Sequence, residues 1–239
     1  MTDSVLYHSR DGIAFITLNR PARRNAIDED MAGRLETAWQ RFEDGADVVA
    51  ILGGADGNFS SGVDMKDPPR SGSRWAPNLG VRVTKPIIAA VEGYCIAGGM
   101  ILLQQADLAV TSATAVFSYP ESRIGFSKGV ASALAARVPH KLAMEMLLLA
   151  QTHSAADLHR AGLVNAMVAP GGTADAALAW ARTLAANDPD CMRLIKQGVL
   201  DMLPKAPGEI AAQLRWASDR LRGNRRIGDP DAAKKDRTA

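Results

Sequence analysis

The chain has 239 residues, of which 47% are hydrophobic and 23% charged, and its formal net charge is +2. These values suit one large globular domain, or a core with an appendage, and they exclude a chain too polar to bury a core. No apolar run approaches the roughly 18 residues that a membrane-spanning helix needs, so we expect no membrane partner.

The positive charge is confined to the C-terminal end. Residues 223–239 contain five basic and three acidic side chains, which accounts for the whole excess of +2. The rest of the chain is balanced and has no basic stripe for a phosphate backbone. We therefore expect no nucleic-acid partner and interpret the tail, from about residue 223, as a flexible, solvated end.

Cysteine and histidine usage indicates the compartment and argues against a metal site. Cys95 and Cys191 lie far apart, in apolar or helical contexts, which is typical of a reduced, cytoplasmic protein. The N-terminus lacks the basic and then apolar segments of a signal peptide. The four histidines show no ligand spacing with cysteine or paired carboxylates, so we expect no metal.

Strands and helices alternate in the first half of the chain. Two apolar segments, 5–9 and 13–18, flank Asp11-Gly12, a hairpin turn signal. A helical stripe runs from Ile27 to Phe42, and Asp28 is placed to cap it. Further strands are expected at 48–52, 87–91 and 108–110, and a helix at 99–106. This strand–strand–helix rhythm, repeated about every 40 residues, predicts an α/β layered core.

From about residue 131 the pattern turns helical. Helices are expected at 141–150, 154–162, 174–186, 190–203 and 208–221. The last two have no strands of their own to cover, so they either fold back on the core or pack on another subunit. We accordingly divide the chain into a core, residues 1–186, and a helical C-terminal oligomerisation region, residues 187–239.

Residues 65–84 form a polar stretch rich in proline, glycine, serine and arginine. It is too long for an ordinary connection, so it is either a functional loop or a mobile one. Trp75 lies in its middle. This tryptophan either packs the loop onto the body of the protein or forms the wall of an apolar ligand pocket.

A turn of small residues joins an apolar strand to a helix at Gly98-Gly99. Glycines at such a turn let a ligand approach the bare backbone. The helix start behind them offers unpaired N–H groups and the positive end of the helix dipole. Together these features predict a site for negative charge, either a bound anion or a charge that develops during a reaction.

Five motifs together resemble the enoyl-CoA hydratase/isomerase (crotonase) family. They are ITLNRP at 16–21 with NA at 25–26, NFSSGVDM at 58–65, KPIIAAVEG at 85–93, AGG at 97–99 with Asp107, and FSYPESRIG at 117–125. They follow the family's order over roughly residues 5–200. The resemblance implies an α/β fold, a crotonase-like spiral of ββα units with a C-terminal helical trimerisation region, and a homotrimer or dimer of trimers.

The resemblance also implies a coenzyme A thioester as substrate, with no further cofactor. Two backbone N–H groups, those of Val63 and Gly98 when carried over by motif, would stabilise the enolate oxygen. The contacts to coenzyme A are assigned to Arg23, Arg24, Ala26, Ser61, Gly62, Asp64 and Lys66, although Arg23 and Arg24 also fit a solvated loop pair. An apolar pocket for the acyl group is assigned to Ile101, Trp75 and Phe126.

The sequence departs from the family's hydratases, which hold one water between two glutamates. Glu121 matches the second glutamate, but Ile101 stands three residues after Gly98, where the first is expected. Isoleucine cannot pass a proton, and losing a positioned acid–base group costs about 10²–10⁴-fold. One carboxylate is enough to move a double bond, and an apolar pocket would raise its pKa. Alternatively, Glu121 is an ordinary surface or salt-bridged carboxylate.

We therefore expect an enoyl-CoA isomerase that converts 3-enoyl-CoA to 2-enoyl-CoA, with Glu121 carrying the proton. A hydratase of altered or weak activity is the first alternative. Hydrolysis or C–C cleavage of a specialised thioester is another. A non-catalytic acyl-CoA binding protein, or a scaffold without a ligand, would keep the fold and lack the chemistry.

Overall fold

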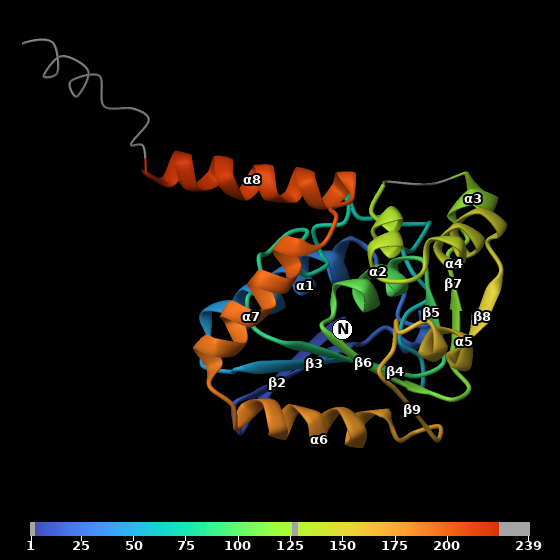
Figure 1. Cartoon of the computed structure of the whole chain (residues 1–239), viewed down its shortest axis with the longest axis horizontal. Coiled ribbons are helices and arrows are strands. Elements are labelled where there is room, and N and C mark those ends of the chain that lie inside the picture. Colours follow the sequence, from blue (N-terminus) through green and yellow to red (C-terminus); the bar gives the residue numbers. More distant parts are fainter. Residues whose placement is uncertain (1–2, 126–128, 225–239) are drawn as a thin grey trace, which may run out of the picture.

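The computed structural model describes residues 3–125 and 129–224, with side chains through residue 216. Its larger sheet has six strands in the order β1-β2-β3-β4-β6-β9 (Figure 1). β1 pairs antiparallel with β2, and the other neighbours pair parallel. The strands are β1 (Val5–Arg10), β2 (Ile13–Leu18), β3 (Val49–Gly54), β4 (Ile87–Val91), β6 (Leu108–Ser112) and β9 (Ala166–Val168).

The smaller sheet has three strands, β5 (Tyr94–Ile96), β7 (Val116–Ser118) and β8 (Thr152–Ser154). β5 and β7 are parallel, and β8 runs antiparallel to β7. An isolated parallel bridge between Ser60 and Cys95 adds the segment after β3 to its edge. After the first hairpin, successive turns of the chain thus place one segment in each sheet. This is the spiral of ββα units predicted from the sequence.

The longer helices lie near the predicted ranges, whereas the short helices at 21–23, 121–124 and 131–136 were not predicted. The side chain of Asp28 accepts a hydrogen bond from the N–H of Met31 at 2.9 Å, so Asp28 caps the first long helix as expected. The helices are η1 (Pro21–Arg23), α1 (Glu29–Asp44), α2 (Gly98–Gln105), α3 (Glu121–Ile124), η2 (Ala131–Ala136), α4 (His140–Met144), the π-helical turn η3 (Glu145–Leu149), α5 (Ala155–Arg160), α6 (Thr173–Ala185), α7 (Pro189–Met202) and α8 (Pro207–Asn224).

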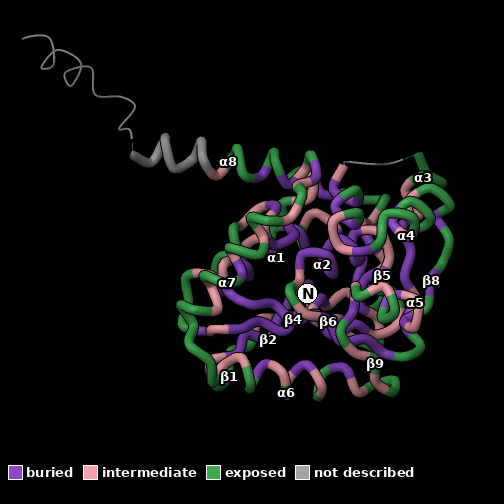
Figure 2. Tube along the Cα trace, in the orientation of Figure 1, coloured by how far each residue is buried: buried purple, intermediate pink, exposed green. Residues whose placement is uncertain are grey.

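The larger sheet is covered on both faces (Figures 1 and 2). α1 and α2 pack on one face, where Trp39 and Phe42 of α1 are fully buried. α6 covers the other face, where its Ala177 and Ala181 pack against Ile88 and its neighbours. A parallel strand enclosed in this way reads as an unbroken apolar run, which is why all five residues of β4 are buried.

The structure corrects several boundaries predicted from the sequence. β5, β7, β8 and β9 have three residues each, too few to show a readable period, and were not predicted. The helix expected at 141–150 is divided between α4 and the π-helical turn η3. α8 continues to Asn224, past the expected end at 221. Residues 225–239 of the predicted flexible tail lie outside the described residues.

The C-terminal helices are tied to the core by buried charged groups. Lys196 of α7 donates to the carbonyl of Lys85 at 2.7 Å and forms an ion pair with Asp107 at 2.8 Å. Glu209 of α8 accepts hydrogen bonds from Gln105 and Arg137, both at 3.0 Å. These helices therefore fold back on the core at these points (Figure 1). Further along α8, Arg215 and Trp216 donate to the carbonyls of Leu79 and Gly80, both at 2.7 Å. The boundary between 186 and 187 stays a prediction.

None of the described helices has the length and apolar character needed to cross a bilayer.

Candidate active site

Three segments leave the smaller sheet at the same edge. Ile96 at the end of β5 pairs with Ser118 at the end of β7, and Ser60 bridges the same strand at Cys95. Since the carboxyl ends of parallel strands meet at one edge of a sheet, the residues that follow these strands are brought together. The edge therefore gathers the turn at 61–63, the start of α2 and the start of α3, which the sequence separates by dozens of residues.

The turns at Gly62 and Gly98 lie against each other. Gly62 has φ of +95°, a conformation that favours glycine, and a Cβ built on it would lie 3.2 Å from the backbone nitrogen of Gly98. A Cβ built on Gly98 would lie 3.3 Å from the nitrogen of Val63 and 3.2 Å from the indole ring of Trp75. The two predicted N–H groups are therefore neighbours, with no space for a side chain between them.

Val63 sits between two backbone hydrogen bonds that fix its turn. The carbonyl of Gly62 accepts from the N–H of Ile27 at 2.8 Å, and the N–H of Asp64 donates to the carbonyl of Ile27 at 2.9 Å. Within the described residues, the N–H groups of Val63 and Gly98 are not donors in any backbone hydrogen bond. Both N–H groups are therefore free to bind an external acceptor.

A cavity of about 200 Å³ opens at this edge of the smaller sheet. It is lined by the predicted residues Val63, Gly98, Ile101, Trp75 and Glu121. The predicted Ser61 also contributes, and the remaining walls come from Met65, Pro69, Gly72, Ser73, Ala97, Pro120, Ile124, Val130 and Ala131. The structure thus brings both predicted N–H groups and the predicted carboxylate to one small, mainly apolar space.

Glu121 begins α3, directly after Pro120, and its side chain is half-buried. Its Oε2 atom is buried and has no hydrogen-bond partner in the described structure. Burial raises the pKa of Glu121 from 4.5 to about 7, because the charged form loses solvation. A carboxylate with such a pKa can accept and release a proton near neutral pH. Among the described residues, Glu121 forms no ion pair.

Ile101 lies one turn into α2 and is 9% exposed. It lines the cavity, and it stands at the sequence position where the resemblance places the first glutamate of the water-holding pair. Of the described residues lining this cavity, Glu121 is the one with a titratable carboxyl group. The cavity therefore offers one proton carrier and an apolar wall.

Trp75 combines the two roles considered from the sequence. It is 1% exposed, and its backbone carbonyl accepts a hydrogen bond from the indole N–H of Trp39 at 3.0 Å. It also lines the cavity. The 65–84 segment is therefore anchored to α1 at its middle, and its tryptophan forms a fixed wall of the site.

Comparison with known proteins establishes the family. The family model described as enoyl-CoA hydratase/isomerase matches residues 8–213. The chain belongs to the enoyl-CoA hydratase/isomerase family. It is therefore an acyl-CoA enzyme of this family, as the motifs predicted.

Several members of the enoyl-CoA hydratase/isomerase family are similar over most of the chain. An (E)-benzylidenesuccinyl-CoA hydratase from Thauera aromatica is 32% identical, covering 91% of this chain and 93% of the relative. An enoyl-CoA hydratase, EchA19, from Mycobacterium tuberculosis is 34% identical over 81% and 79%. The crystal structure of a probable enoyl-CoA hydratase/isomerase from Mycobacterium abscessus has a TM-score of 0.79 and 35% identity, covering 89% and 87%. These likenesses confirm the crotonase fold.

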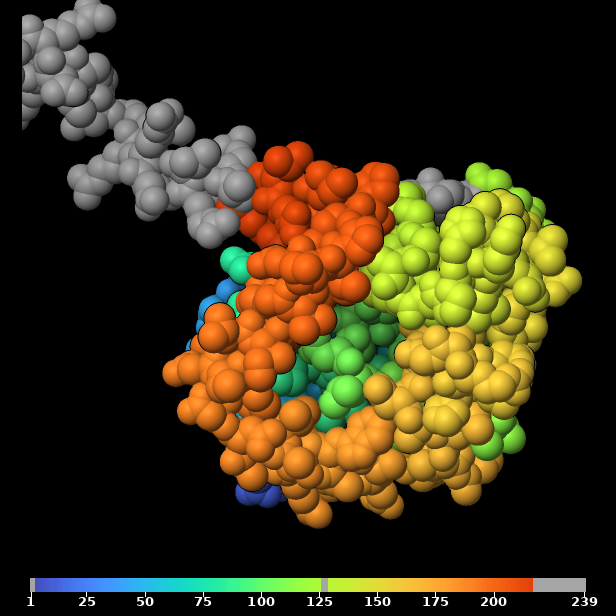
Figure 3. All heavy atoms as spheres, in the orientation of Figure 1, coloured from blue at the N-terminus to red at the C-terminus, as the bar shows by residue number. Residues whose placement is uncertain are grey.

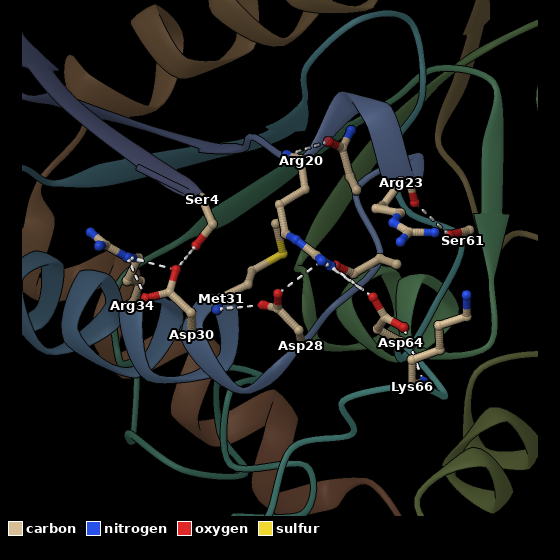
Figure 4. Close-up of polar contacts among 12 residues, drawn as sticks. Ser4, Arg20, Arg23, Asp28, Asp30, Met31, Arg34, Ser61, Asp64 and Lys66 are labelled. Carbon is tan, nitrogen blue, oxygen red and sulfur yellow. Dashed lines mark hydrogen bonds and ion pairs between the residues drawn. The ribbon is translucent and has the colours of Figure 1, made fainter. Parts of the chain in front are cut away.

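The residues assigned to coenzyme A line up along two adjacent segments. The N–H of Ser61 donates a hydrogen bond to the carbonyl of Arg24 at 2.9 Å. Its hydroxyl donates a second one to the carbonyl of Arg23 at 3.2 Å (Figure 4). Arg23, Arg24 and Lys66 are exposed, while Ala26 and Gly62 are buried. The carboxylate of Asp64 forms an ion pair with the guanidinium of Arg20 at 3.2 Å and accepts a hydrogen bond from the N–H of Lys66 at 3.1 Å. The assignment to coenzyme A stays a prediction, and Asp64 already has partners within the chain.

The sequence analysis did not identify several walls of the cavity or the contacts of Arg20, and one predicted site residue lies outside the described part of the chain. The walls contributed by Pro69, Ser73, Val130 and Ala131 lie outside the quoted motifs, in irregular segments or a very short helix, where no period marks a buried face. Met65 and Ile124 lie within quoted motifs, but the sequence analysis assigned them no role. Arg20 belongs to a quoted motif, yet its role depends on contacts with residues distant in sequence. Phe126, predicted for the acyl pocket, lies outside the described residues. In the described part of the chain, no three potential metal ligands of the His, Cys, Asp or Glu types gather.

A larger cavity, of about 480 Å³, lies away from this site. It is bordered by α7, the end of α2 and the start of β6. Figure 3 shows it as a hollow with green atoms at its floor and the orange atoms of α7 on its rim. It contains neither Glu121 nor the turn at Val63, so its size does not make it the catalytic centre.

Proposed function

We propose that this enzyme isomerises 3-enoyl-CoA to 2-enoyl-CoA. The observation that carries the proposal is the pairing of Glu121 with Ile101 in one apolar cavity, beside two free N–H groups. Hydration by a glutamate pair needs a second carboxylate to hold water, whereas isomerisation needs one group that takes up a proton and gives it back. The pKa of Glu121, raised to about 7 by burial, suits both halves of that task.

The reaction would proceed in two proton transfers. Ionised Glu121 removes a proton from C2, and the electron pair moves into a dienolate whose negative charge rests on the thioester oxygen. The N–H groups of Val63 and Gly98 donate hydrogen bonds to that oxygen, each contributing roughly 3–4 kcal/mol by analogy with comparable sites. Glu121 then returns the same proton to C4, and the double bond settles between C2 and C3. No atoms are gained or lost, so the sequence of steps requires no cofactor.

Hydration of a 2-enoyl-CoA is the second candidate function. The curated relatives are named hydratases, which favours it. In this chain it would have to proceed with Glu121 as the acid–base group and with Ile101 against the substrate. Since an aliphatic side chain cannot orient water, we expect hydration to be the slower of the two reactions.

Two thioesters distinguish the candidates. Purified protein is incubated separately with 3-enoyl-CoA and with 2-enoyl-CoA, and the products are followed by chromatography. We expect isomerisation of the first, and a fall of about 10²–10⁴-fold in Glu121→Gln. Glu145→Gln is the matched control, because Glu145 is an exposed glutamate outside this cavity. Product from 2-enoyl-CoA alone would establish the hydratase, and calorimetric binding without turnover of either thioester would establish a non-catalytic acyl-CoA binding protein.

We also propose that the enzyme assembles as a homotrimer or dimer of trimers through α7. Four side chains of this helix are exposed although apolar: Leu194 at 75%, Ile195 at 60%, Val199 at 58% and Met202 at 85%. Ile195 and Val199 border the 480 Å³ hollow, so the patch and the hollow form one surface. Contiguous apolar surface of this kind usually marks an interface. Another copy of the chain would cover it.

Sedimentation velocity tests the assembly. We expect a mass of three or six chains for the natural sequence and a smaller species for Val199→Asp, because the added charge would be buried without a partner. Asp190→Asn, at the start of the same helix, serves as a control for a change of charge alone. A monomeric natural protein would refute the proposal.

A further inference from the structure

The guanidinium of Arg20 joins the turn of Val63 to the start of α1. Its Nη1 donates to the carbonyl of Ala26 at 2.6 Å, and both terminal nitrogens lie 3.2 Å from Asp64. Its Nη2 also forms an ion pair with Asp28 at 2.9 Å. Figure 4 shows the side chain of Arg20 pointing between these two carboxylates, which come from different segments. One planar cation thus holds three acceptors.

The two carboxylates are themselves fixed by backbone groups. Asp28 accepts from the N–H of Met31 as the cap of α1, and Asp64 accepts from the N–H of Lys66. The hydrogen bond from Lys66 lowers the pKa of Asp64; burial opposes this effect, and the hydrogen bond and charge of Arg20 add to the lowering. The side chains of Arg20, Asp28 and Asp64 are 14–21% exposed, so solvent screens this cluster less than a surface pair. Asp64 directly follows Val63.

We propose that Arg20 is a positioning residue, which directs the N–H of Val63 at the thioester oxygen. The inference rests on the proposed function of that N–H group. Two backbone hydrogen bonds join Gly62 and Asp64 to Ile27, on either side of Val63, and the ion pair with Arg20 adds a side-chain contact at Asp64. In this proposal the added contact keeps the turn from rotating about the two backbone hydrogen bonds. An N–H donor stabilises developing charge only when it is aimed correctly, so rotation of the turn reduces catalysis while leaving contacts to the rest of the substrate intact.

Lysine cannot replace arginine in this role. A lysine ammonium keeps the charge, but it is a compact group on a flexible stem and lacks the planar fork that reaches the carbonyl of Ala26 and both carboxylates together. Arg20→Lys therefore keeps a positive charge at this position and removes the planar geometry of the guanidinium. Asp64→Asn is the second variant, because it removes the contact at the turn while keeping the ion pair between Arg20 and Asp28.

The matched control is Arg34→Lys. Arg34 pairs with Asp30 at 2.9 Å and Asp3 at 2.8 Å, and its side chain is 43% exposed on the same helix that Asp28 caps (Figure 4). It is an arginine with two carboxylate partners and no contact with the turn of Val63. A general effect of weakening ion pairs at α1 would appear in this variant too.

The experiment uses butyryl-CoA labelled with carbon-13 at the thioester carbonyl, a saturated ester that cannot turn over. Infrared difference spectra report how strongly the bound carbonyl is polarised, and calorimetry reports its dissociation constant. We expect Arg20→Lys and Asp64→Asn to lose most of the carbonyl shift seen in the natural protein. Arg20 is not among the residues assigned to coenzyme A, so in Arg20→Lys the dissociation constant should stay within about threefold, and on 3-enoyl-CoA kcat should fall about 10–100-fold with KM little changed. Arg34→Lys should leave all these values unchanged.

An unchanged carbonyl frequency in Arg20→Lys and Asp64→Asn would overturn the proposal, as would an equal effect in Arg34→Lys. If both variants near the turn unfold, Arg20 serves stability and the positioning role is rejected. Binding of butyryl-CoA without any isomerisation would reject the proposed function, while the carbonyl frequency would still decide the role of Arg20. Absence of binding by the natural protein would reject both.

Discussion

Replacing Glu121 by glutamine should change how the stability of the protein depends on pH. In the folded protein burial raises the pKa of Glu121 from 4.5 to about 7, whereas in the unfolded chain the group keeps its ordinary value. Between these two values the folded state holds the proton more tightly. The stabilising contribution of the protonated group is therefore complete below about pH 4.5 and is lost as the pH rises through about 7.

The magnitude follows from the difference between the two pKa values. A rise from 4.5 to about 7 corresponds to roughly 3 kcal/mol if it is expressed in full. Because the side chain is half-buried, solvent screening lowers the expected effect to about 2 kcal/mol. Glutamine has a similar shape and no charge, so it removes this pH-dependent contribution. Glu121→Gln should thus gain about 2 kcal/mol relative to the natural protein between pH 5 and pH 8.

Urea unfolding at a fixed protein concentration measures this difference. Midpoints and slopes are recorded at several pH values for the natural protein, Glu121→Gln and the exposed control Glu145→Gln. Subtracting the two curves removes the contributions of all other titrating groups. The reasoning fails if the difference between Glu121→Gln and the natural protein stays constant from pH 5 to pH 8, or if Glu145→Gln shows the same dependence.

Three further predictions concern the same site. The kcat/KM for 3-enoyl-CoA should fall about tenfold per pH unit below about 7, because Glu121 must be ionised to accept a proton, and a flat profile down to pH 5 would contradict its role as the base. Gly98→Ala should destabilise the fold by about 1–3 kcal/mol and lower kcat about 10²-fold, because the new methyl group would meet Trp75 and the nitrogen of Val63; thermal unfolding and turnover check this. Trp39→Phe leaves the buried carbonyl of Trp75 without its hydrogen-bond donor, so we expect the free energy of unfolding, measured in urea, to fall by about 1–3 kcal/mol. A fall of less than about 0.3 kcal/mol would contradict the importance of this hydrogen bond.

Local patterns in the sequence determined the positions of several helices and strands and identified the family. The spacing of apolar residues and the cap at Asp28 located α1, and the run from Ile87 to Val91 located a buried strand. These features depend on neighbours within a few residues, so they can be read directly from the chain. The motifs added the family, and with it the identity of Val63, Gly98 and Glu121 as candidates.

The tertiary structure decided what those candidates can do. Val63 and Gly98 become neighbours because Ser60 and Cys95 pair in the smaller sheet, whose three-residue strands carry no readable pattern. The pKa of Glu121 depends on how far the folded chain excludes water from it. Arg20 meets Asp64 across 44 positions of sequence. Pairing over such distances and burial are properties of the packed chain, because both are set by which distant segments exclude solvent together.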